Sequence, residues 1–133
     1  MKRSKDYKEQ KTLLKVIELE GFIKEESYRN TDETLFIDTM EYPITKFLEE
    51  NIKNKIVTVR YWISNIKQTK EQIQEAATLT VMGLLESEFW EQYSEITGYL
   101  GTDETLNVGG HDLLEELRSN IDNYIILEIE IYD

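Results

Sequence analysis

Histidine and cysteine, the side chains most often used for nucleophilic and metal chemistry, are nearly missing from this chain. Its 133 residues include one histidine, His111, and no cysteine. Disulfides, thiolate metal sites, two-histidine metal sites and catalysis by paired histidines are therefore excluded within one chain. Asp112 and Glu115 lie near His111, but a polar residue that follows Gly109-Gly110 is better explained as the start of a helix. We predict no metal and no cofactor.

Carboxylate pairs are too common in the sequence to indicate a catalytic site. Glu18 with Glu20, or Glu128 with Glu130, could each serve as the acid and base of a glycosidase-like enzyme. Many other pairs qualify equally, so none is selected. The chain also lacks a G-x-S-x-G nucleophile elbow and a calcium loop, and Gly109-Gly110 is too short for a phosphate loop. We predict that the protein is not an enzyme.

The net charge of −12 is unevenly distributed along the chain. Residues 1–70 contain 14 basic and 12 acidic side chains, a net charge of +2, whereas residues 71–133 contain 15 acids and only Arg118, a net charge of −14. Direct binding of nucleic acid needs clustered lysine and arginine, so this distribution argues against it. An acidic surface instead attracts a basic partner and speeds its association. The predicted partner is a basic protein surface, such as that of a nuclease or another nucleic-acid-binding protein.

Aromatic residues lie among the acids of the second half. Trp90 stands between Glu88 and Glu91, and tryptophan and tyrosine are frequent anchors of protein interfaces. Strand alternation would place several of the carboxylates in rows. The predicted partner-binding surface comprises Glu86, Glu88, Trp90, Glu91, Tyr93, Glu95, Asp103, Glu104, Glu128 and Glu130.

Periodicity of the apolar residues predicts the elements that carry these side chains. Alternating residues predict strands at 12–23, 34–39, 55–64, 93–100 and 124–132, and helical spacing predicts helices at 43–54, 69–85 and 112–121. The helix at 69–85 has apolar positions at i, i+3, i+4 and i+7, and Thr69 with Gln72 forms its capping pair. The predicted class is α+β, a mainly antiparallel sheet packed by about three helices.

Two segments of the sequence repeat. Residues 31–35 and 102–106 both read TDETL, and each copy comes before an expected short helix and strand. The repeat predicts two β-β-α-β halves, 12–64 and 89–133, joined by the central helix. The alternative is chance repetition in a chain rich in isoleucine, glutamate and lysine. Residues 1–133 are expected to form a single domain, with a basic segment at residues 1–11 that frays.

Together these features predict a small acidic inhibitor. Our leading hypothesis is an antagonist of a nucleic-acid-binding defence enzyme, encoded by a phage or mobile element and similar in action to anti-CRISPR and anti-restriction proteins, which blocks a basic groove. We expect a monomer or homodimer. We expect it in the cytoplasm, because no stretch approaches the ~20 apolar residues of a membrane span and the N-terminal segment does not read as a secretory signal.

Two alternatives remain open from the sequence. The first is an immunity protein or antitoxin that covers the basic active site of a toxin nuclease, which uses the same physics. The second is a sponge or enzyme for a small nucleotide signal. Arg29, Lys55 and Arg60 of the more basic half would then contact phosphate.

Overall fold

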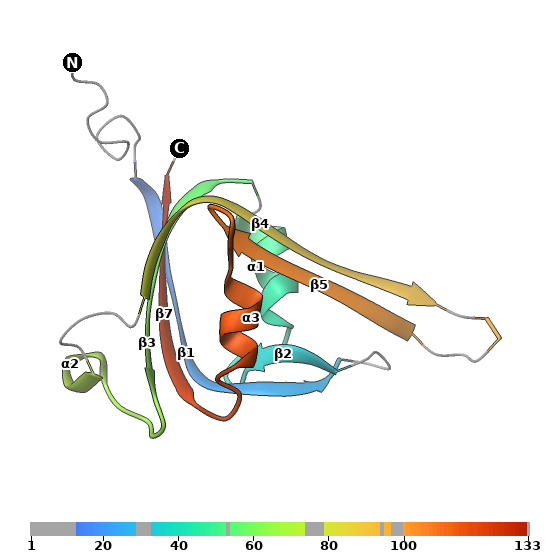
Figure 1. Cartoon of the computed structure of the whole chain (residues 1–133), viewed down its shortest axis with the longest axis horizontal. Helices are drawn as coiled ribbons and strands as arrows, with labels where there is room; N and C mark the ends of the chain where they lie inside the picture. Colours follow the sequence, from blue (N-terminus) through green and yellow to red (C-terminus); the bar gives the residue numbers. More distant parts are fainter. Residues whose placement is uncertain are drawn as a thin grey trace, which may run out of the picture.

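Seven strands form one antiparallel sheet in the order β2-β1-β7-β3-β4-β5-β6 (Figure 1). The computed structural model describes residues 13–28, 33–52, 54–73, 79–93, 95–96 and 100–132. The strands are β1 (Leu13–Ser27), β2 (Glu33–Ile37), β3 (Ile56–Ser64), β4 (Leu79–Tyr93), β5 (Leu100–Val108), β6 (His111–Asp112) and β7 (Tyr124–Tyr132). The described helices are the short α1 (Ile44–Ile52), α2 (Lys70–Ile73) and α3 (Leu113–Arg118). Sheet therefore dominates, and the class is mainly β rather than the predicted α+β.

The predicted helix at 69–85 is wrong. Among the described residues of this stretch, only those of α2 are helical, and from Leu79 the chain forms the long strand β4. Burial along β4 alternates, with Met82, Leu84 and Glu86 exposed and Leu85 and Ser87 buried. Apolar residues in this stretch satisfy both the helical and the strand period, and pairing with β3 and β5 selects the strand. Of the predicted strand at 93–100, Tyr93 ends β4, residues 95 and 96 form a turn and Leu100 begins β5, and the other residues lie outside the described part of the chain.

Two glycines allow the long strands β1 and β4 to change partners. Up to Phe22, β1 pairs with β7, and from Ile23 it pairs with β2. In the same way β4 pairs with β3 up to Leu84 and then with β5. Gly21 and Gly83 lie at these changes with φ of 151° and 149°, a region that side chains other than glycine rarely adopt. The strands curve there, so the sheet wraps around α1 and α3 (Figure 1).

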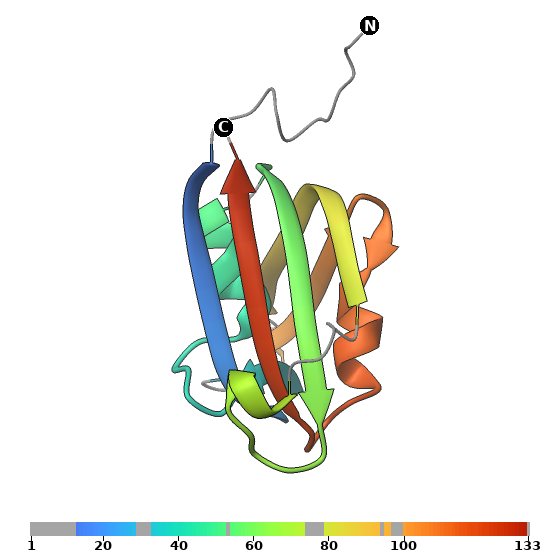
Figure 2. The same ribbon diagram turned by 90° about the vertical axis from the view of Figure 1, so that its left-hand side faces the viewer.

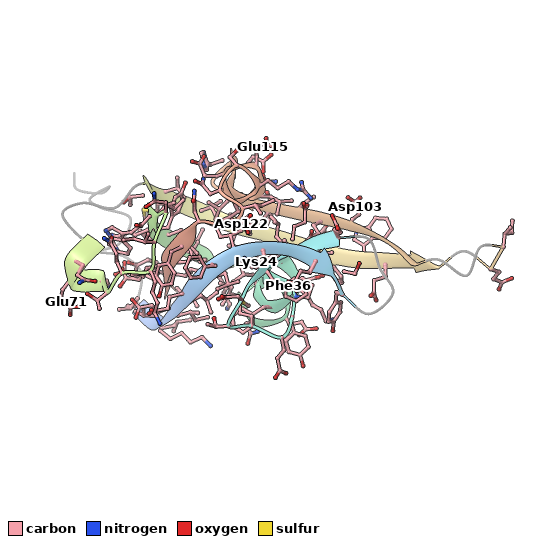
Figure 3. The ribbon with its side chains drawn as sticks, turned by 90° about the horizontal axis from the view of Figure 1, so that it is seen from below. Lys24, Phe36, Glu71, Asp103, Glu115 and Asp122 are labelled. Carbon is pink, nitrogen blue, oxygen red and sulfur yellow. The ribbon has the colours of Figure 1, made fainter. Side chains whose placement is uncertain are left out.

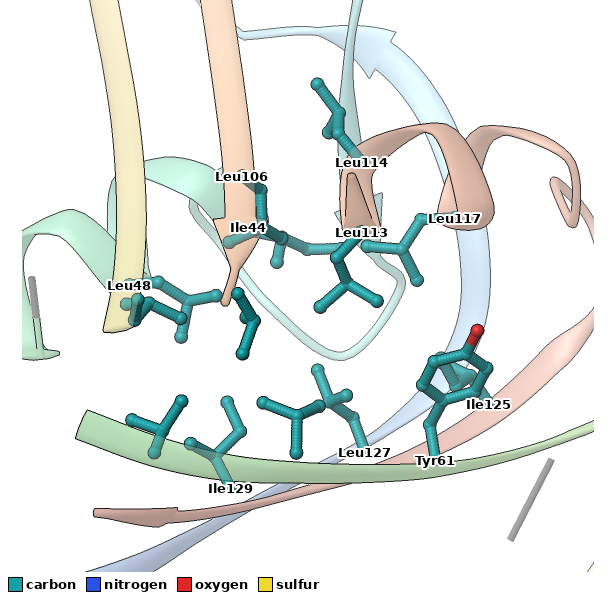
Figure 4. Close-up of a cluster of buried hydrophobic side chains, with 14 of the residues drawn as sticks. Ile44, Leu48, Tyr61, Leu106, Leu113, Leu114, Leu117, Ile125, Leu127 and Ile129 are labelled. Carbon is teal, nitrogen blue, oxygen red and sulfur yellow. The ribbon is translucent and has the colours of Figure 1, made fainter. Parts of the chain in front are cut away.

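The main core lies on the concave face of the sheet. Leu48 of α1 and Leu117 of α3 are fully buried in one cluster with inward residues such as Leu127 and Ile129 (Figure 4). Burial of one such aliphatic side chain contributes roughly 1.5–3 kcal/mol. Odd-numbered residues of β3 and β7 therefore supply the core, as their alternation predicts.

The opposite face of the sheet has a smaller apolar cluster of Phe22, Trp62, Tyr124 and Ile126. The α2 helix lies on this face, across the sheet from α1 and α3 (Figure 2). Lys70 of α2 places Nζ 5.2 Å from the centre of the Trp62 ring. The connection between β3 and β4 thus provides local cover for an outer cluster.

The order strand, strand, helix, strand occurs twice along the chain. It runs β1-β2-α1-β3 and then β4-β5-α3-β7, with the two-residue β6 before α3. The second series begins at Leu79, earlier than the predicted boundary at residue 89, because β4 replaces the expected central helix. The predicted basic segment at residues 1–11 lies outside the described residues.

Candidate partner-binding surface

A β-hairpin extends from the body of the protein and carries most of the predicted binding residues. We call it the acidic arm, defined as residues 86–93 of β4 and 100–107 of β5, which pair throughout. Figures 1 and 3 show it reaching past the other elements, with Asp103 along its length. Because side chains alternate, Glu86, Glu88 and Trp90 share the exposed face. Trp90 is 55% exposed, which is unusual for so large an apolar side chain.

The exposed face of the acidic arm has two parallel rows of side chains. Glu86, Glu88 and Trp90 follow β4, and their partners across the hairpin are Asn107, Thr105 and Asp103. Along each row the spacing is about 6.8 Å, two residues of an antiparallel strand. No lysine or arginine occurs anywhere from residue 71 to residue 117. The arm therefore presents carboxylates and one large aromatic ring without basic side chains of its own.

The buried face fixes the base of the acidic arm to the body. Phe89 packs edge-on to Tyr28, with ring centroids 6.0 Å apart, and Tyr28 in turn contacts Phe36 of β2. The backbone N–H of Phe89 donates to a Glu49 carboxylate oxygen on α1 at 3.0 Å. Ser87 Oγ donates to the carbonyl oxygen of Thr45 at 2.8 Å. These contacts hold the arm in place as far as Phe89.

Glu104 belongs to the same hairpin but does not face solvent. Its side chain is 3% exposed, and Thr45 Oγ1 donates to Oε1 at 2.7 Å. The carboxylate also accepts from the backbone N–H of Leu35, and Arg118 Nη2 lies 4.0 Å from Oε2. Burial raises the pKa of Glu104 above its usual range, against the opposing effect of these donors. Glu104 links β5 to β2 and α1 and does not contribute to the exposed surface.

Because its folded-state pKa is raised, ionised Glu104 costs stability at neutral pH. The contribution of Glu104 to the free energy of unfolding falls as the pH rises from its pKa in the unfolded chain through its pKa in the folded protein. We expect Glu104→Gln to gain stability relative to the unmodified protein as the pH increases from 5 to 7.5. Glu104→Ala leaves two buried donors unmatched and should lose about 1–3 kcal/mol at both pH values. Urea denaturation of both variants measures this, and parallel pH profiles for the Gln variant and the unmodified protein would contradict it.

Glu128 and Glu130 lie on the outer face of β7, on the four-stranded part of the sheet, and are already paired. Arg60 Nη1 is 3.4 Å from a Glu128 oxygen and 3.2 Å from a Glu130 oxygen. Lys70 Nζ is 2.9 Å from Glu128 and 3.1 Å from Glu18, and Tyr132 OH donates to Glu130 at 2.7 Å. Their charge is therefore largely balanced within the chain.

Lys70 should stabilise the cover over Trp62. Its two carboxylate partners raise its pKa, so the contribution persists through neutral pH and is lost as pH rises through that pKa. Half-exposed pairs contribute little individually, and we expect Lys70→Ala to cost about 1 kcal/mol and to shift Trp62 emission to the red. Fluorescence in a Trp90→Phe background measures the shift. Lys67→Ala, an exposed lysine nearby, is the control, and an equal shift there would refute the role of Lys70.

Of the remaining predicted residues, Glu91, Glu95 and Asp103 are exposed at or near the acidic arm. The side chain of Tyr93 lies outside the described residues. Sequence reasoning missed Thr105 and Asn107, which share the exposed face with Glu88 and Glu86. Recognition of 85–93 and 100–108 as one hairpin would have found both.

His111 shows no sign of metal chemistry within the described chain. Asp112 is the N-cap of α3 and accepts a hydrogen bond from the Glu115 backbone N–H at 3.1 Å, as the sequence predicts for a helix start. Among the described residues, no group of three or more potential ligands is placed to hold a metal ion.

None of the described helices is long and apolar enough to cross a membrane. Comparison of the whole chain with protein-family models, curated proteins and solved structures finds no match.

Proposed function

We propose that this protein is an inhibitor that inserts its acidic arm into the basic groove of a nucleic-acid-binding protein. The observation that carries the proposal is the exposed face of the hairpin, where Glu86 and Glu88 precede the exposed Trp90 along β4 and Asp103 lies opposite Trp90 on β5. Lysine and arginine side chains that normally contact phosphates would contact these carboxylates instead. Occupation of the groove would exclude the nucleic acid sterically.

The regular spacing of the acidic arm supports this interpretation. A repeat of about 6.8 Å along the strand equals two base-pair rises of about 3.4 Å along one DNA strand. Trp90 adds an apolar anchor, and a ring of this kind can stack where the groove normally receives a base. The net charge of −14 in residues 71–133 would steer a basic partner toward this half of the chain.

The physics is shared by two biological settings. A phage or mobile-element antagonist of a defence enzyme and an immunity protein for a toxin nuclease both cover a basic nucleic-acid site, and the identity of the partner distinguishes them. The nucleotide-sponge alternative is less favoured, because Arg60, one of its phosphate contacts, is engaged by Glu128 and Glu130.

The test is capture followed by displacement. The unmodified protein and the Glu86→Lys/Glu88→Lys variant would each be immobilised and exposed to host lysate. Any protein retained in larger amount by the former would be purified and loaded with fluorescent DNA or RNA. We expect the unmodified protein to release the nucleic acid at equimolar amounts, as measured by anisotropy.

A matched control carries the same charge change elsewhere. Glu41→Lys/Glu115→Lys reverses two exposed acids outside the acidic arm and should displace nucleic acid as the unmodified protein does. Equal loss of activity in both double variants would show that bulk charge, rather than the arm, is responsible. Retention of a partner that binds no nucleic acid would overturn the proposal.

A further inference from the structure

The strands of the two halves correspond to one another. Within each pair of corresponding strands, the residue numbers differ by a constant. Gly21 corresponds to Gly83, because β1 and β4 change partners at these two glycines. Strands β3 and β7 have equal length, and they begin at the same distance after Asn54 and Asp122, which both have positive φ. Asn54 thus corresponds to Asp122. An alignment of the sequence motifs NIKN (51–54) and NIDN (120–123) would instead match Asn54 with Asn123.

The repeated TDETL sequence obeys the same correspondence. Leu35, the last residue of the first copy, pairs with Glu25, and Leu106, the last residue of the second copy, pairs with Ser87. Glu25 and Ser87 are themselves counterparts, because each lies equally far beyond its glycine, Gly21 or Gly83. A chance repeat has no reason to agree with the register of two separate hairpins. The agreement supports a duplicated unit whose copies are related by an approximate twofold axis at the Arg60–Glu128 pair.

The shift that relates β1 to β4 continues upstream of both strands. Before β4, the α2 segment contains Lys70-Glu71-Gln72, and at the corresponding positions before β1 the chain reads Lys8-Glu9-Gln10. Lys67 likewise corresponds to Lys5. The α2 segment precedes β4 and lies over the outer cluster. The sequence that precedes β1 therefore matches the sequence of this covering segment.

The twofold relation also links the two ends of the outer face. The covered cluster at one end includes Phe22, Trp62 and Tyr124. At the other end, an apolar row crosses four adjacent strands in register: Leu13, Tyr132, Ile56 and Leu84. The next row across the same four strands begins at Val16 on β1 and ends at Met82 on β4. The side chains at the ends of both rows, Leu13, Val16, Met82 and Leu84, are 37–49% exposed. Among the described helices, α2 is the one on this face, and it lies at the opposite end (Figure 2).

We propose that residues 5–12 of the same chain dock on this apolar row, as the α2 segment does on its counterpart. These residues lie outside the described part of the chain, and they end at Thr12, which is bonded to Leu13, the first member of the row. Tyr7 supplies an apolar side chain. In this arrangement the twofold relation would place Lys8, the counterpart of Lys70, above Glu130, the counterpart of Trp62. The positions of Glu18 and Glu128, the two carboxylates that Lys70 contacts, are taken by Thr80 and Arg60, so apolar contact with the row, rather than ion pairing, would hold the segment.

The absence of cysteine makes a direct test possible in the 133-residue chain. The Ser4→Cys variant would carry a nitroxide spin label. The NMR intensities of its backbone amide signals would be compared before and after reduction of the label. We expect the Met82 and Leu84 amides on β4 to lose at least half of their intensity, while Trp62 and Ile126 at the opposite end keep theirs. Signals near Leu13 are not informative, because the label is close to them along the chain.

Two further measurements make the result decisive. Leu84→Asp in the row should restore the Met82 signal, whereas Ile66→Asp, which changes another exposed apolar residue outside it, should not. Spin-labelled protein without isotope enrichment would also be mixed with isotope-enriched protein that carries no spin label. Broadening in that mixture would identify a second copy as the occupant and overturn the proposal.

Unchanged β4 signals, or broadening confined to Glu86 and Glu88, would also overturn the proposal. The latter would mean that the basic segment binds the acidic arm. The proposal depends on the duplication and not on the inhibitor function. Unchanged β4 signals would therefore overturn it without affecting the displacement experiment.

Discussion

Replacement of Gly83 with alanine is expected to lower the free energy of unfolding by roughly 3–5 kcal/mol, near the upper limit for a single substitution. At φ of +149° an added Cβ is strained by itself. It would also collide with Gly109 Cα and lie 2.9 Å from Gly109 N. Both atoms are backbone and cannot rotate away. Urea denaturation should show a lower midpoint with an unchanged m-value.

Gly110 provides the matched control. Its φ is +86°, but an added Cβ meets nothing within 4 Å, so Gly110→Ala should cost only the backbone strain, about 1–2 kcal/mol. Gly21→Ala should fall between the two, because its Cβ meets side chains of Asp38 and Ile37, which can adjust. If Gly83→Ala and Gly110→Ala were equally destabilising, close approach of Gly109 would not be the cause.

Trp90→Ala is expected to weaken binding of the partner by about 10–100-fold, the range of an interface anchor. The ring is 55% exposed in the free protein, so its removal should leave the melting temperature within experimental error. The loss should appear mainly as faster dissociation. Glu86→Lys/Glu88→Lys should instead slow association about tenfold at low salt and flatten its salt dependence. Surface plasmon resonance with the captured partner separates the two effects.

Tyr42→Ala is the control for loss of an exposed aromatic ring. Tyr42 is 45% exposed and lies outside the acidic arm, near Tyr28 at the base of the hairpin. It should leave dissociation unchanged. Similar losses for Trp90 and Tyr42 would place the binding surface across the body of the protein and not on the arm.

Local patterns in the sequence predict some of these features because neighbouring residues determine them. Every odd-numbered residue of β3 and β7 is apolar, and Pro43 precedes α1 with apolar residues at helical spacing. The exposed positions of Glu86, Glu88 and Trp90 follow from alternation once the strand is known. At residues 79–85 the apolar pattern satisfies two periods, and only pairing with β3 decides between them.

Features that depend on distant partners could not be predicted in this way. Glu104 is buried because it meets Thr45, 59 residues away in sequence. Glu128 is neutralised by Arg60, 68 residues away. A count of acidic residues treats all of these carboxylates alike, whereas the fold places Glu104, Glu128 and Glu130 away from the acidic arm's exposed face.

The central position of β7 has a consequence for how the chain folds during synthesis. This strand, residues 124–132, lies between β1 and β3 and is the last described strand to leave the ribosome. Until then β1 and β3 have no partner at the centre of the sheet, and their edges stay open to other chains. The centre of the sheet therefore cannot form before residues 124–132 have been synthesised, which favours slow folding and leaves these strand edges open in the meantime.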